Sequence, residues 1–207
     1  MKPLVISHRG ACWDEPENTL PAFERAIEMG ADYVEFDVRS APDGTLVCAH
    51  DRVRTQPPPH VPTLDDALAA LAGRVGVAVE IKEQAVTTRV LDALREHEVE
   101  ANQLLILSSH AKALDLAQRL RPDVRLVLHL STWRPDPTAA TRFWGVGFED
   151  RTARPRIIAS AQSFGLATTV YTVNEPRRML ELAALGVTGI FTDRPDLLRQ
   201  TLDSEQA

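Results

Sequence analysis

Two carboxylates lie two residues apart in the stretch from 33 to 51, YVEFDVRSAPDGTLVCAHD. Glu35 and Asp37 alternate with valine and phenylalanine, which is the pattern of a β-strand. Because successive side chains of a strand point to opposite faces, both carboxylates share one face. Two negative charges about 4.5 Å apart repel by roughly 3 to 4 kcal/mol at an effective dielectric constant of about 20, and a cation between them relieves this repulsion. The stretch therefore predicts a metal site.

A predicted hairpin folds a histidine back toward this site. Asp43 and Gly44 follow the strand, and an Asp-Gly pair favours a tight turn between antiparallel strands. The returning segment 45–50 ends at His50, and Asp51 follows it. Imidazole titrates near neutral pH, so His50 is a candidate acid or base beside the metal.

Two further apolar runs end in residues that suit the same chemistry. The first run of the chain ends at His8 and is followed by Arg9, and a later run carries Glu80 and Lys82 with the alternation of the first carboxylate pair. An ionised pair inside a strand that is covered on both faces is costly unless a metal, a ligand or a water-filled cavity receives it. These strand ends therefore predict one polar site.

The elements that must position these residues alternate along the chain. We expect strands at 4–8, 34–38, 76–82, 104–108, 125–130, 144–148, 168–173 and 189–192. We expect helices at 19–29, 63–71, 87–97, 113–120, 156–164 and 176–184, and one more between the strands that end at 130 and begin at 144. Eight such strands alternating with helices predict an α/β fold, a single (β/α)8 TIM barrel over residues 1–207. A barrel of this kind carries its active site at the C-terminal ends of its strands.

Composition limits the class of protein. The chain has 207 residues, 44% of them hydrophobic, which is enough for one core and one domain. A formal net charge of −6 argues against nucleic acid as the main partner, so any anionic substrate must be held by local positive groups. Only Cys12 and Cys48 are present, no apolar run reaches membrane-spanning length, and a strand-like run from residue 4 leaves no room for a signal peptide. We therefore expect a cytoplasmic protein without a transmembrane segment.

Short motifs in a fixed order resemble the glycerophosphodiester phosphodiesterase family. They are SHRG at 7–10, PENT at 16–19, GAD at 30–32, VEFDV at 34–38, DG at 43–44, HD at 50–51, EIK at 80–82, YTVN at 171–174 and GVTGIFTD at 186–193. The resemblance implies metal-dependent hydrolysis of glycerophosphodiesters to an alcohol and sn-glycerol 3-phosphate. It also implies that the glycerol 2-hydroxyl attacks phosphorus first and that water then opens a cyclic phosphate.

The resemblance also implies roles for individual residues. Glu35, Asp37 and Glu80 are expected to hold a divalent cation, and an all-carboxylate set favours Mg²⁺ or Ca²⁺ over zinc. His8 and His50 are expected to be the acid-base pair, with no assignment of which is acid and which is base. The substrate-binding residues are expected to be Arg9 and Lys82, which suit a phosphate, and Tyr171, which lines the pocket or packs in the barrel where the family usually has tryptophan.

Other polar residues have structural interpretations. Asn18 or Thr19 is interpreted as a helix N-cap, and Asn174 and Asp193 as caps before prolines. The two cysteines are interpreted as small buried hydrophobic residues. Among the histidines without a motif, only His129 stands at a strand end.

The segment 52–62, RVRTQPPPHVP, is short where the resembled family usually carries a longer capping insertion. Its three consecutive prolines favour a stiff, extended loop, so the cap is expected to be reduced or absent. Two alternatives stay open: a lysophospholipase D-type enzyme that acts on lysophospholipids, and a non-catalytic module that binds phosphodiesters. A glycosidase using Glu35 and Glu80 as its carboxylate pair would leave two histidines and an arginine at the barrel mouth without a role.

Overall fold

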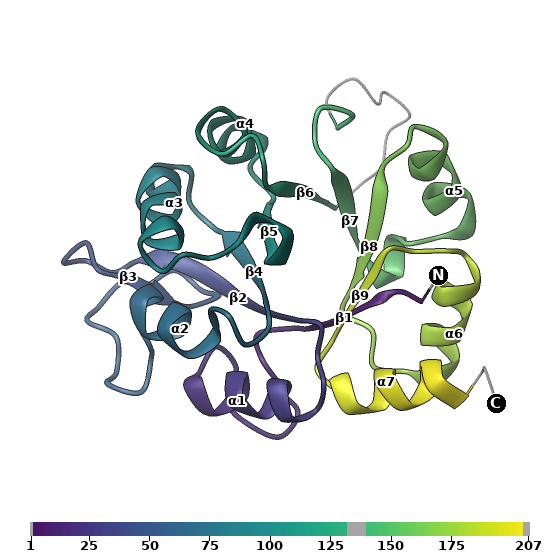
Figure 1. Cartoon of the computed structure of the whole chain (residues 1–207), viewed down its shortest axis with the longest axis horizontal. Coiled ribbons are helices and arrows are strands. Elements are labelled where there is room, and N and C mark those ends of the chain that lie inside the picture. The colour runs from purple at the N-terminus through teal and green to yellow at the C-terminus, as the bar shows by residue number, and fades with distance from the viewer. Residues whose placement is uncertain (1, 132–139, 205–207) are drawn as a thin grey trace.

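In the computed structural model, which describes residues 2–131 and 140–204, eight parallel strands close into a barrel (Figure 1). The order β1-β9-β8-β7-β6-β5-β4-β2 is closed by pairing of β1 with β2. The strands are β1 (Leu4–Ser7), β2 (Tyr33–Ser40), β4 (Gly76–Ile81), β5 (Leu104–Ser108), β6 (Arg125–Leu130), β7 (Gly145–Glu149), β8 (Ala167–Tyr171) and β9 (Gly189–Thr192). The predicted TIM barrel is confirmed.

Helices surround this barrel (Figure 1). They are α1 (Leu20–Glu28), α2 (Leu64–Leu71), α3 (Thr87–Glu96), α4 (Ala111–Leu120), α5 (Pro155–Ser163), α6 (Pro176–Ala184) and α7 (Pro195–Ser204), with short 3₁₀ turns η1 (Gln84–Val86), η2 (Ala101–Gln103) and η4 (Asp150–Thr152). Helix α7 was not predicted. The helix expected after β6 falls largely on 132–139, outside the described residues, and the described residues that flank this gap form turns and a bend.

Helix starts follow from local side-chain chemistry. The Thr19 hydroxyl accepts a hydrogen bond from the Ala22 N–H, so the predicted N-cap of α1 is confirmed at Thr19. At α2, Thr63 and Asp66 form a capping box: the Thr63 hydroxyl accepts from the Asp66 N–H at 3.1 Å, and the Asp66 carboxylate accepts from the Thr63 N–H at 3.0 Å. These caps fix where two of the connecting loops end.

Strand alternation separates two apolar layers. Side chains such as Val34, Phe36 and Val38 pack outward against the helices. The inward-facing residues form a smaller cluster of Ile6, Tyr33, Ala78, Leu105, Leu107, Val127 and Phe191. Glu35 and Asp37 share the inward parity of Tyr33, and the register of β2 on β4 pairs Asp37 with Glu80. The barrel thus has an apolar floor and a polar layer near the C-terminal ends of its strands.

The hairpin after β2 forms as expected. Strand β3 (Leu46–Cys48) runs antiparallel to β2, with Val38 opposite Cys48. The segment from 52 to 62 contains no helix or strand and is mostly exposed, so the reduced cap is confirmed. None of the helices in the described ranges is long and apolar enough to cross a membrane.

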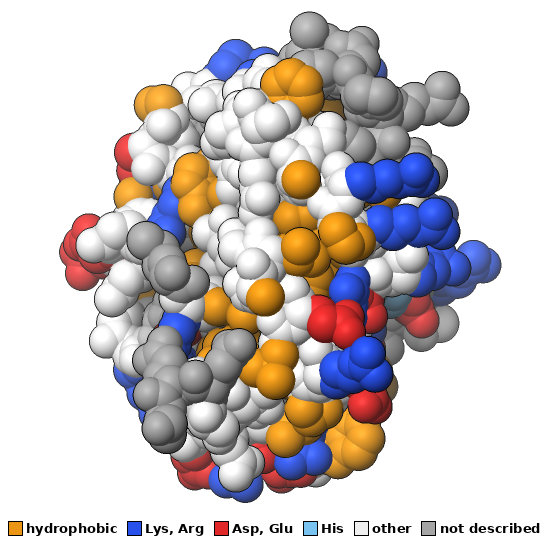
Figure 2. All heavy atoms as spheres, turned by 90° about the vertical axis from the view of Figure 1, so that its right-hand side faces the viewer, with side chains coloured by type: hydrophobic (Ala, Val, Ile, Leu, Met, Phe, Trp, Pro, Cys, Tyr) orange, Lys and Arg blue, Asp and Glu red, His pale blue; other side chains and the backbone are white. Residues whose placement is uncertain are grey.

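Figure 2 shows the face that α5, α6 and α7 cover. Hydrophobic side chains on the visible part of this face lie between polar and charged ones, and lysine and arginine side chains gather toward one edge. Charged side chains on this face are mixed with apolar ones, whereas the ionisable residues of the barrel mouth line a single cavity.

Candidate active site

One cavity of about 160 Å³ at the C-terminal mouth of the barrel brings the predicted residues together. Its lining residues are His8, Arg9, Glu35, His50, Glu80, Lys82, Ser109, His129, Tyr171 and Phe191. Asp37 is the one predicted site residue outside this lining, and it lies directly behind the cavity with 1% of its side chain exposed. Residues from both ends of the chain therefore meet at one polar site.

Three carboxylates form the deepest part of the site. Glu35, Asp37 and Glu80 each offer an oxygen, and these atoms lie within 4.8 Å of one another. Burial, followed by the charges of Asp37 and Glu80, raises the pKa of Glu35 well above its ordinary value. A carboxyl group in these surroundings is ionised more easily when a cation is close.

The nearest cations in the structure belong to the chain itself. The Lys82 ammonium lies 3.0 Å from Asp37 Oδ1 and 2.9 Å from Glu80 Oε1. Burial lowers the pKa of Lys82, but Glu80 and Asp37 more than offset burial and raise it. The Arg9 guanidinium lies 3.2 Å from Asp37 Oδ2, and the Arg9 backbone N–H donates to Glu35 at 2.8 Å. Both residues predicted to bind phosphate therefore contact the carboxylates here.

The donor set fits a hard divalent cation. All three side chains offer oxygen, which Mg²⁺ and Ca²⁺ prefer. Asp37 Oδ1 is buried, and its nearest cation is the Lys82 ammonium at 3.0 Å. A buried carboxylate oxygen needs a cationic or hydrogen-bonding partner, and a divalent cation would supply one in place of or beside Lys82.

The loop between β1 and α1 supports Asp37 through Asn18. The Asn18 side-chain amide donates to Asp37 Oδ2 at 2.9 Å, and its carbonyl oxygen accepts from the Asp37 N–H at 3.1 Å. Asn18 adopts a left-handed φ of 56°, which asparagine tolerates better than most residues. Of the two residues considered as the cap of α1, Asn18 is therefore not the one, because both ends of its amide are used on Asp37.

The same loop turns sharply after His8. Arg9 and Gly10 both have positive φ values, 54° and 82°. A Cβ added at Gly10 would lie 2.7 Å from backbone and side-chain carbons of Ala22, so the loop packs on α1 only with glycine there. This close approach directs the Arg9 N–H toward Glu35.

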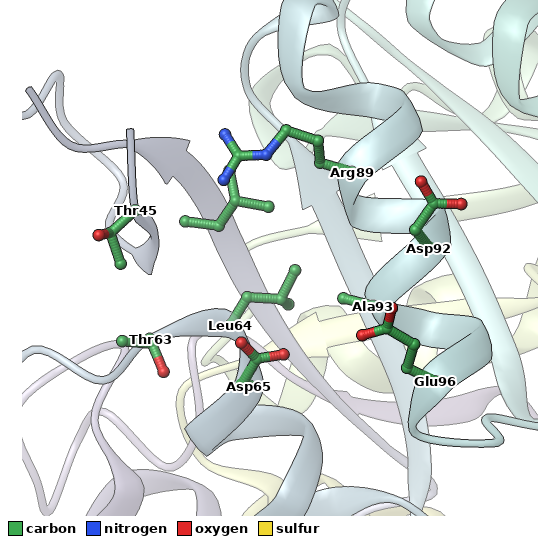
Figure 3. A pocket seen from close by; sticks show the side chains of 9 residues that line it. Thr45, Thr63, Leu64, Asp65, Arg89, Asp92, Ala93 and Glu96 are labelled. Carbon is green, nitrogen blue, oxygen red and sulfur yellow. The ribbon is translucent and has the colours of Figure 1, made fainter. Parts of the chain in front are cut away.

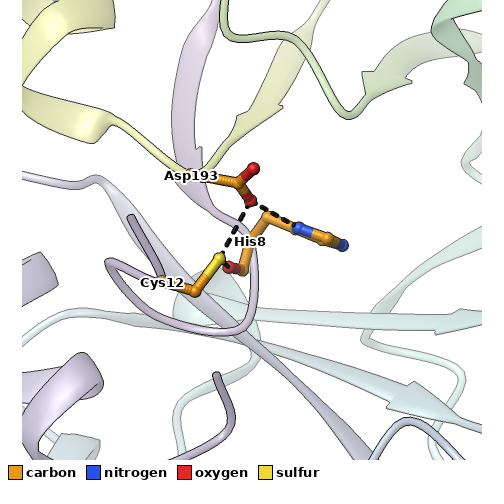
Figure 4. A group of neighbouring side chains, drawn as sticks. All are labelled: His8, Cys12 and Asp193. Atoms are coloured by element: carbon orange, nitrogen blue, oxygen red, sulfur yellow. Dashed lines mark hydrogen bonds and ion pairs between the residues drawn. The ribbon is translucent and has the colours of Figure 1, made fainter. Parts of the chain in front are cut away.

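His8 is held by Asp193 (Figure 4). Its Nδ1 lies 2.8 Å from Asp193 Oδ1, and the other ring nitrogen points away from that carboxylate. Asp193 Oδ2 accepts from the Asn174 amide at 2.7 Å, and the Cys12 thiol donates to Oδ1 at 3.0 Å. Burial raises the pKa of Asp193, but the hydrogen bonds from His8, Cys12 and Asn174 outweigh it and lower the pKa to about 2.

The interpretation of Asn174 and Asp193 as helix caps is wrong. The N-cap of α6 is Glu175, without a side-chain cap bond, and the carbonyl oxygen of Asn174 accepts from Thr192 Oγ1 and the Asp193 N–H, each at 2.9 Å. The carboxylate of Asp193 serves His8. The parity of β9 places Asp193 on the inward face with Phe191, but only the pairing of β1 with β9 shows that His8 lies beside it.

His50 occupies a different setting at the rim. Its Nδ1 lies 2.9 Å from Asp51 Oδ1, and the two side chains are 40% and 97% exposed. The backbone carbonyl of His50 accepts from Arg39 Nε at 2.7 Å, which ties the residue to β2. The hairpin thus brings His50 to the cavity, as predicted, while its ring stays in contact with solvent.

His129 is a cavity residue that the sequence analysis left without a role. It is 8% exposed, its Nδ1 lies 3.6 Å from Glu80 Oε2, and its ring stacks on Tyr171 at 4.5 Å. Burial raises the pKa of Glu80, but His129 and Lys82 outweigh burial and hold it well below its ordinary value. A Cβ at Gly147 would lie 2.5 Å from the His129 ring, so the glycine of β7 provides the space. The sequence signal that could have placed His129 in the cavity is its position at the end of a predicted strand.

Another hollow lies outside the barrel, between the hairpin and helices α2 and α3 (Figure 3). It measures about 440 Å³, and its charged lining residues are Asp65, Arg89, Asp92 and Glu96. Among the described residues only two groups of ligand-type side chains come close enough to share an ion, and neither is in this hollow. The smaller cavity at the mouth is therefore the candidate active site.

Comparisons with known proteins identify relatives of this chain. Residues 8–75 and 53–197 match the model of the glycerophosphoryl diester phosphodiesterase family. The glycerophosphodiester phosphodiesterase of Caldanaerobacter subterraneus subsp. tengcongensis is 25% identical, and the match covers 96% of this chain and 97% of that protein. At least 29 of the 236 aligned positions have no counterpart in the 207 residues here.

Solved structures share the fold. The glycerophosphodiester phosphodiesterase from Agrobacterium tumefaciens superposes with a TM-score of 0.79 at 28% identity, covering 97% of this chain and 100% of that one. An Oleispira antarctica phosphodiesterase in complex with the product sn-glycerol-3-phosphate has a TM-score of 0.88 at 22% identity, covering 98% and 97%. With a family match over most of its length and the site residues gathered at the barrel mouth, this chain belongs to the glycerophosphoryl diester phosphodiesterase family.

Proposed function

We propose that this protein hydrolyses glycerophosphodiesters to an alcohol and sn-glycerol 3-phosphate. The observation that carries the proposal is a single barrel mouth at which three carboxylates, three histidines, an arginine and a lysine meet. The Oleispira antarctica phosphodiesterase was solved with the product sn-glycerol-3-phosphate, which supports a small-molecule substrate of this class. Family membership supports the reaction, and the arrangement of side chains supports the roles below.

Glu35, Asp37 and Glu80 would hold a divalent cation, Mg²⁺ or Ca²⁺. When bound, such an ion supplies Lewis-acid stabilisation of the phosphate charge that grows in the transition state. Arg9 and Lys82 add positive charge at the same cavity, and their guanidinium and ammonium groups suit phosphate oxygens. Tyr171, which stacks on His129 and lines the cavity at the end of β8, would also contact the substrate.

His8 and His50 would move the protons. One histidine takes the proton from the glycerol 2-hydroxyl as that oxygen attacks phosphorus, and the other gives a proton to the departing alcohol oxygen. Water then opens the cyclic phosphate, with the same two residues acting in reverse. Asp193 favours the tautomer of His8 with its proton on Nδ1, which leaves Nε2 free for the cavity.

Lysophospholipids are a second candidate substrate class. The segment 52–62 forms no packed cap, and Trp13, in the loop between β1 and α1, is 63% exposed. An open rim with an exposed indole can accommodate a substrate that carries an acyl chain. A screen of glycerophosphodiesters and lysophospholipids, with products identified by mass, separates the two classes.

Metal dependence is tested by chelation and add-back. Because the carboxylates repel one another, we expect chelated protein to lose activity, and Mg²⁺ or Ca²⁺ to restore it and to raise the melting temperature. Glu80→Gln should weaken both effects of the cation. Glu96→Gln makes the same chemical change in the hollow beside α3 and should leave both effects intact.

The outcomes separate the parts of the proposal. Full turnover after exhaustive chelation would remove the metal from the mechanism while leaving the hydrolysis standing. No turnover of either substrate class with either metal, in protein whose melting temperature responds to the cation, would instead favour a module that binds phosphodiesters without cleaving them.

A further inference from the structure

A second group of ligand-type side chains lies beside the carboxylates, on the β1 and β9 side of the mouth (Figure 4). His8, Cys12 and Asp193 each offer one atom, and these three atoms lie within 4.8 Å of one another. The Cys12 sulfur is 3.0 Å from Asp193 Oδ1, the oxygen that also contacts His8 Nδ1 at 2.8 Å. Nitrogen, sulfur and oxygen donors therefore converge on one point.

This donor set differs in kind from the carboxylate cluster. A thiolate and an imidazole favour zinc and similar borderline-soft cations, whereas three carboxylates favour Mg²⁺ or Ca²⁺. Zinc binds thiolate sulfur, imidazole nitrogen and carboxylate oxygen at roughly 2.0 to 2.3 Å, so a tetrahedral site would require the present contacts to widen by only about half an ångström. All three residues are partly accessible, with 18% of the His8 side chain and 22% of the Asp193 side chain exposed.

We propose that His8, Cys12 and Asp193 form a zinc-type metal site that inhibits the enzyme when it is occupied. The cation replaces the proton on His8 Nδ1 and the proton of the Cys12 thiol, both of which the structure directs at Asp193. Its fourth position remains open to water, because the chain supplies three donors.

Occupancy would stop catalysis for a simple reason, given the proposed role of His8. Asp193 now orients the His8 ring and stabilises the proton that the ring gains. With a cation on Nδ1, the carboxylate is used as a ligand, and the ring carries the positive charge of the ion next to it. Its Nε2 then accepts a proton less readily. The same residues would thus serve the reaction when free and block it when metallated.

Cobalt(II) tests the site without relying on activity, since a thiolate ligand gives it a sulfur-to-metal charge-transfer band. With Mg²⁺ in excess, we expect wild-type protein to show this band. Cys48→Ala should keep it, because the other cysteine is buried on β3. Glu80→Gln, in the carboxylate cluster, should also keep it. Cys12→Ser and His8→Ala should lose it.

The second measurement is inhibition by zinc, expressed for each variant as a fraction of that variant's own activity without zinc. The zinc concentration that halves turnover should rise at least about tenfold in Cys12→Ser, and Cys12→Ala should agree if the serine variant folds poorly. Absence of the cobalt band from wild-type protein, or its survival in Cys12→Ser, would overturn the site. Equal zinc sensitivity in wild-type and Cys12→Ser protein would overturn its inhibitory role. Neither result bears on hydrolysis itself.

Discussion

His8 and His50, the two histidines proposed to move protons, each have a carboxylate next to Nδ1, and the surroundings of these two pairs differ. His8 and Asp193 are 18% and 22% exposed, whereas His50 and Asp51 are 40% and 97% exposed. Asp193 is held in turn by Asn174, but Asp51 is the neighbour of His50 in sequence and lies in solvent. An exposed ion pair contributes little to stability or orientation, while a partly buried and hydrogen-bonded one contributes more.

The difference follows from the elements that carry each pair. His8 and Asp193 follow neighbouring parallel strands, since Ser7 of β1 pairs with Thr192 of β9. His50 follows β3, a short strand on the outside of β2, and precedes an irregular loop. Interior strands therefore fix one histidine in advance, and the other is positioned by a hairpin at the rim.

The largest expected effect is the loss of either imidazole. His8→Ala and His50→Ala should each lower kcat by about 10² to 10⁴ with the fold intact, because each removes a proton-transfer group. Steady-state kinetics on glycerophosphocholine measure the effect, and circular dichroism checks folding. Near-normal turnover in either soluble variant would remove that residue from the mechanism.

A glycerophosphodiester whose leaving group is p-nitrophenolate should show which of the two histidines is the acid and which is the base. A departing p-nitrophenolate needs no proton, so the variant that lacks the general acid should recover on that substrate while the variant that lacks the base should not. Recovery of one variant assigns the two roles. Equal recovery of both would show that neither histidine is dedicated to one step.

The next largest effects on kcat are expected at the carboxylates that contact the two histidines, and these effects should differ in size. Asp193→Asn should lower kcat by about 10 to 100-fold, since it removes a charge-assisted hydrogen bond to a partly buried ring. Asp51→Asn makes the same change at the exposed pair and should cost less than about fivefold. Similar losses in the two variants would contradict the view that burial makes Asp193 the stronger support.

Stability should depend on pH through Asp193. Its pKa is about 2 in the folded protein against an ordinary value of 3.8, so the folded state favours the ionised form by about 2 kcal/mol. That contribution is complete above roughly pH 5 and is lost as pH falls from about 4 toward 2. Urea unfolding of wild-type and Asp193→Asn protein at pH 7, 5 and 3 should therefore show a difference that narrows at pH 3, and a constant difference would be evidence against the lowered pKa.

The smallest expected effect concerns the open side of the mouth. Because segment 52–62 forms no packed cap, the departing alcohol should project into an open cleft and contribute little binding energy. We expect kcat/KM for glycerophosphocholine, glycerophosphoethanolamine and larger head groups to agree within roughly tenfold, about 1.4 kcal/mol. A preference above about a hundredfold in that series would show that another loop takes the place of the cap.

Much of this protein could be predicted from its sequence because the signals are local. The alternation around Glu35 and Asp37 and its repeat at Glu80 placed these carboxylates on an inward face, and the Asp-Gly turn placed His50 near them. Strand and helix positions followed from the periods of apolar residues, which report the burial of one face of each element. Thr19 as a helix cap is a property of the few residues around it.

The tertiary structure alone decided the contacts between distant segments. Asp193 is 185 residues from His8 and contacts it only because β9 pairs with β1. Asn18 used its amide on Asp37 rather than on the nearby helix, and His129 fitted beside Glu80 because β7 offers Gly147. Local sequence determines which way each side chain faces, whereas hydrogen bonding between strands determines which neighbour it finds there.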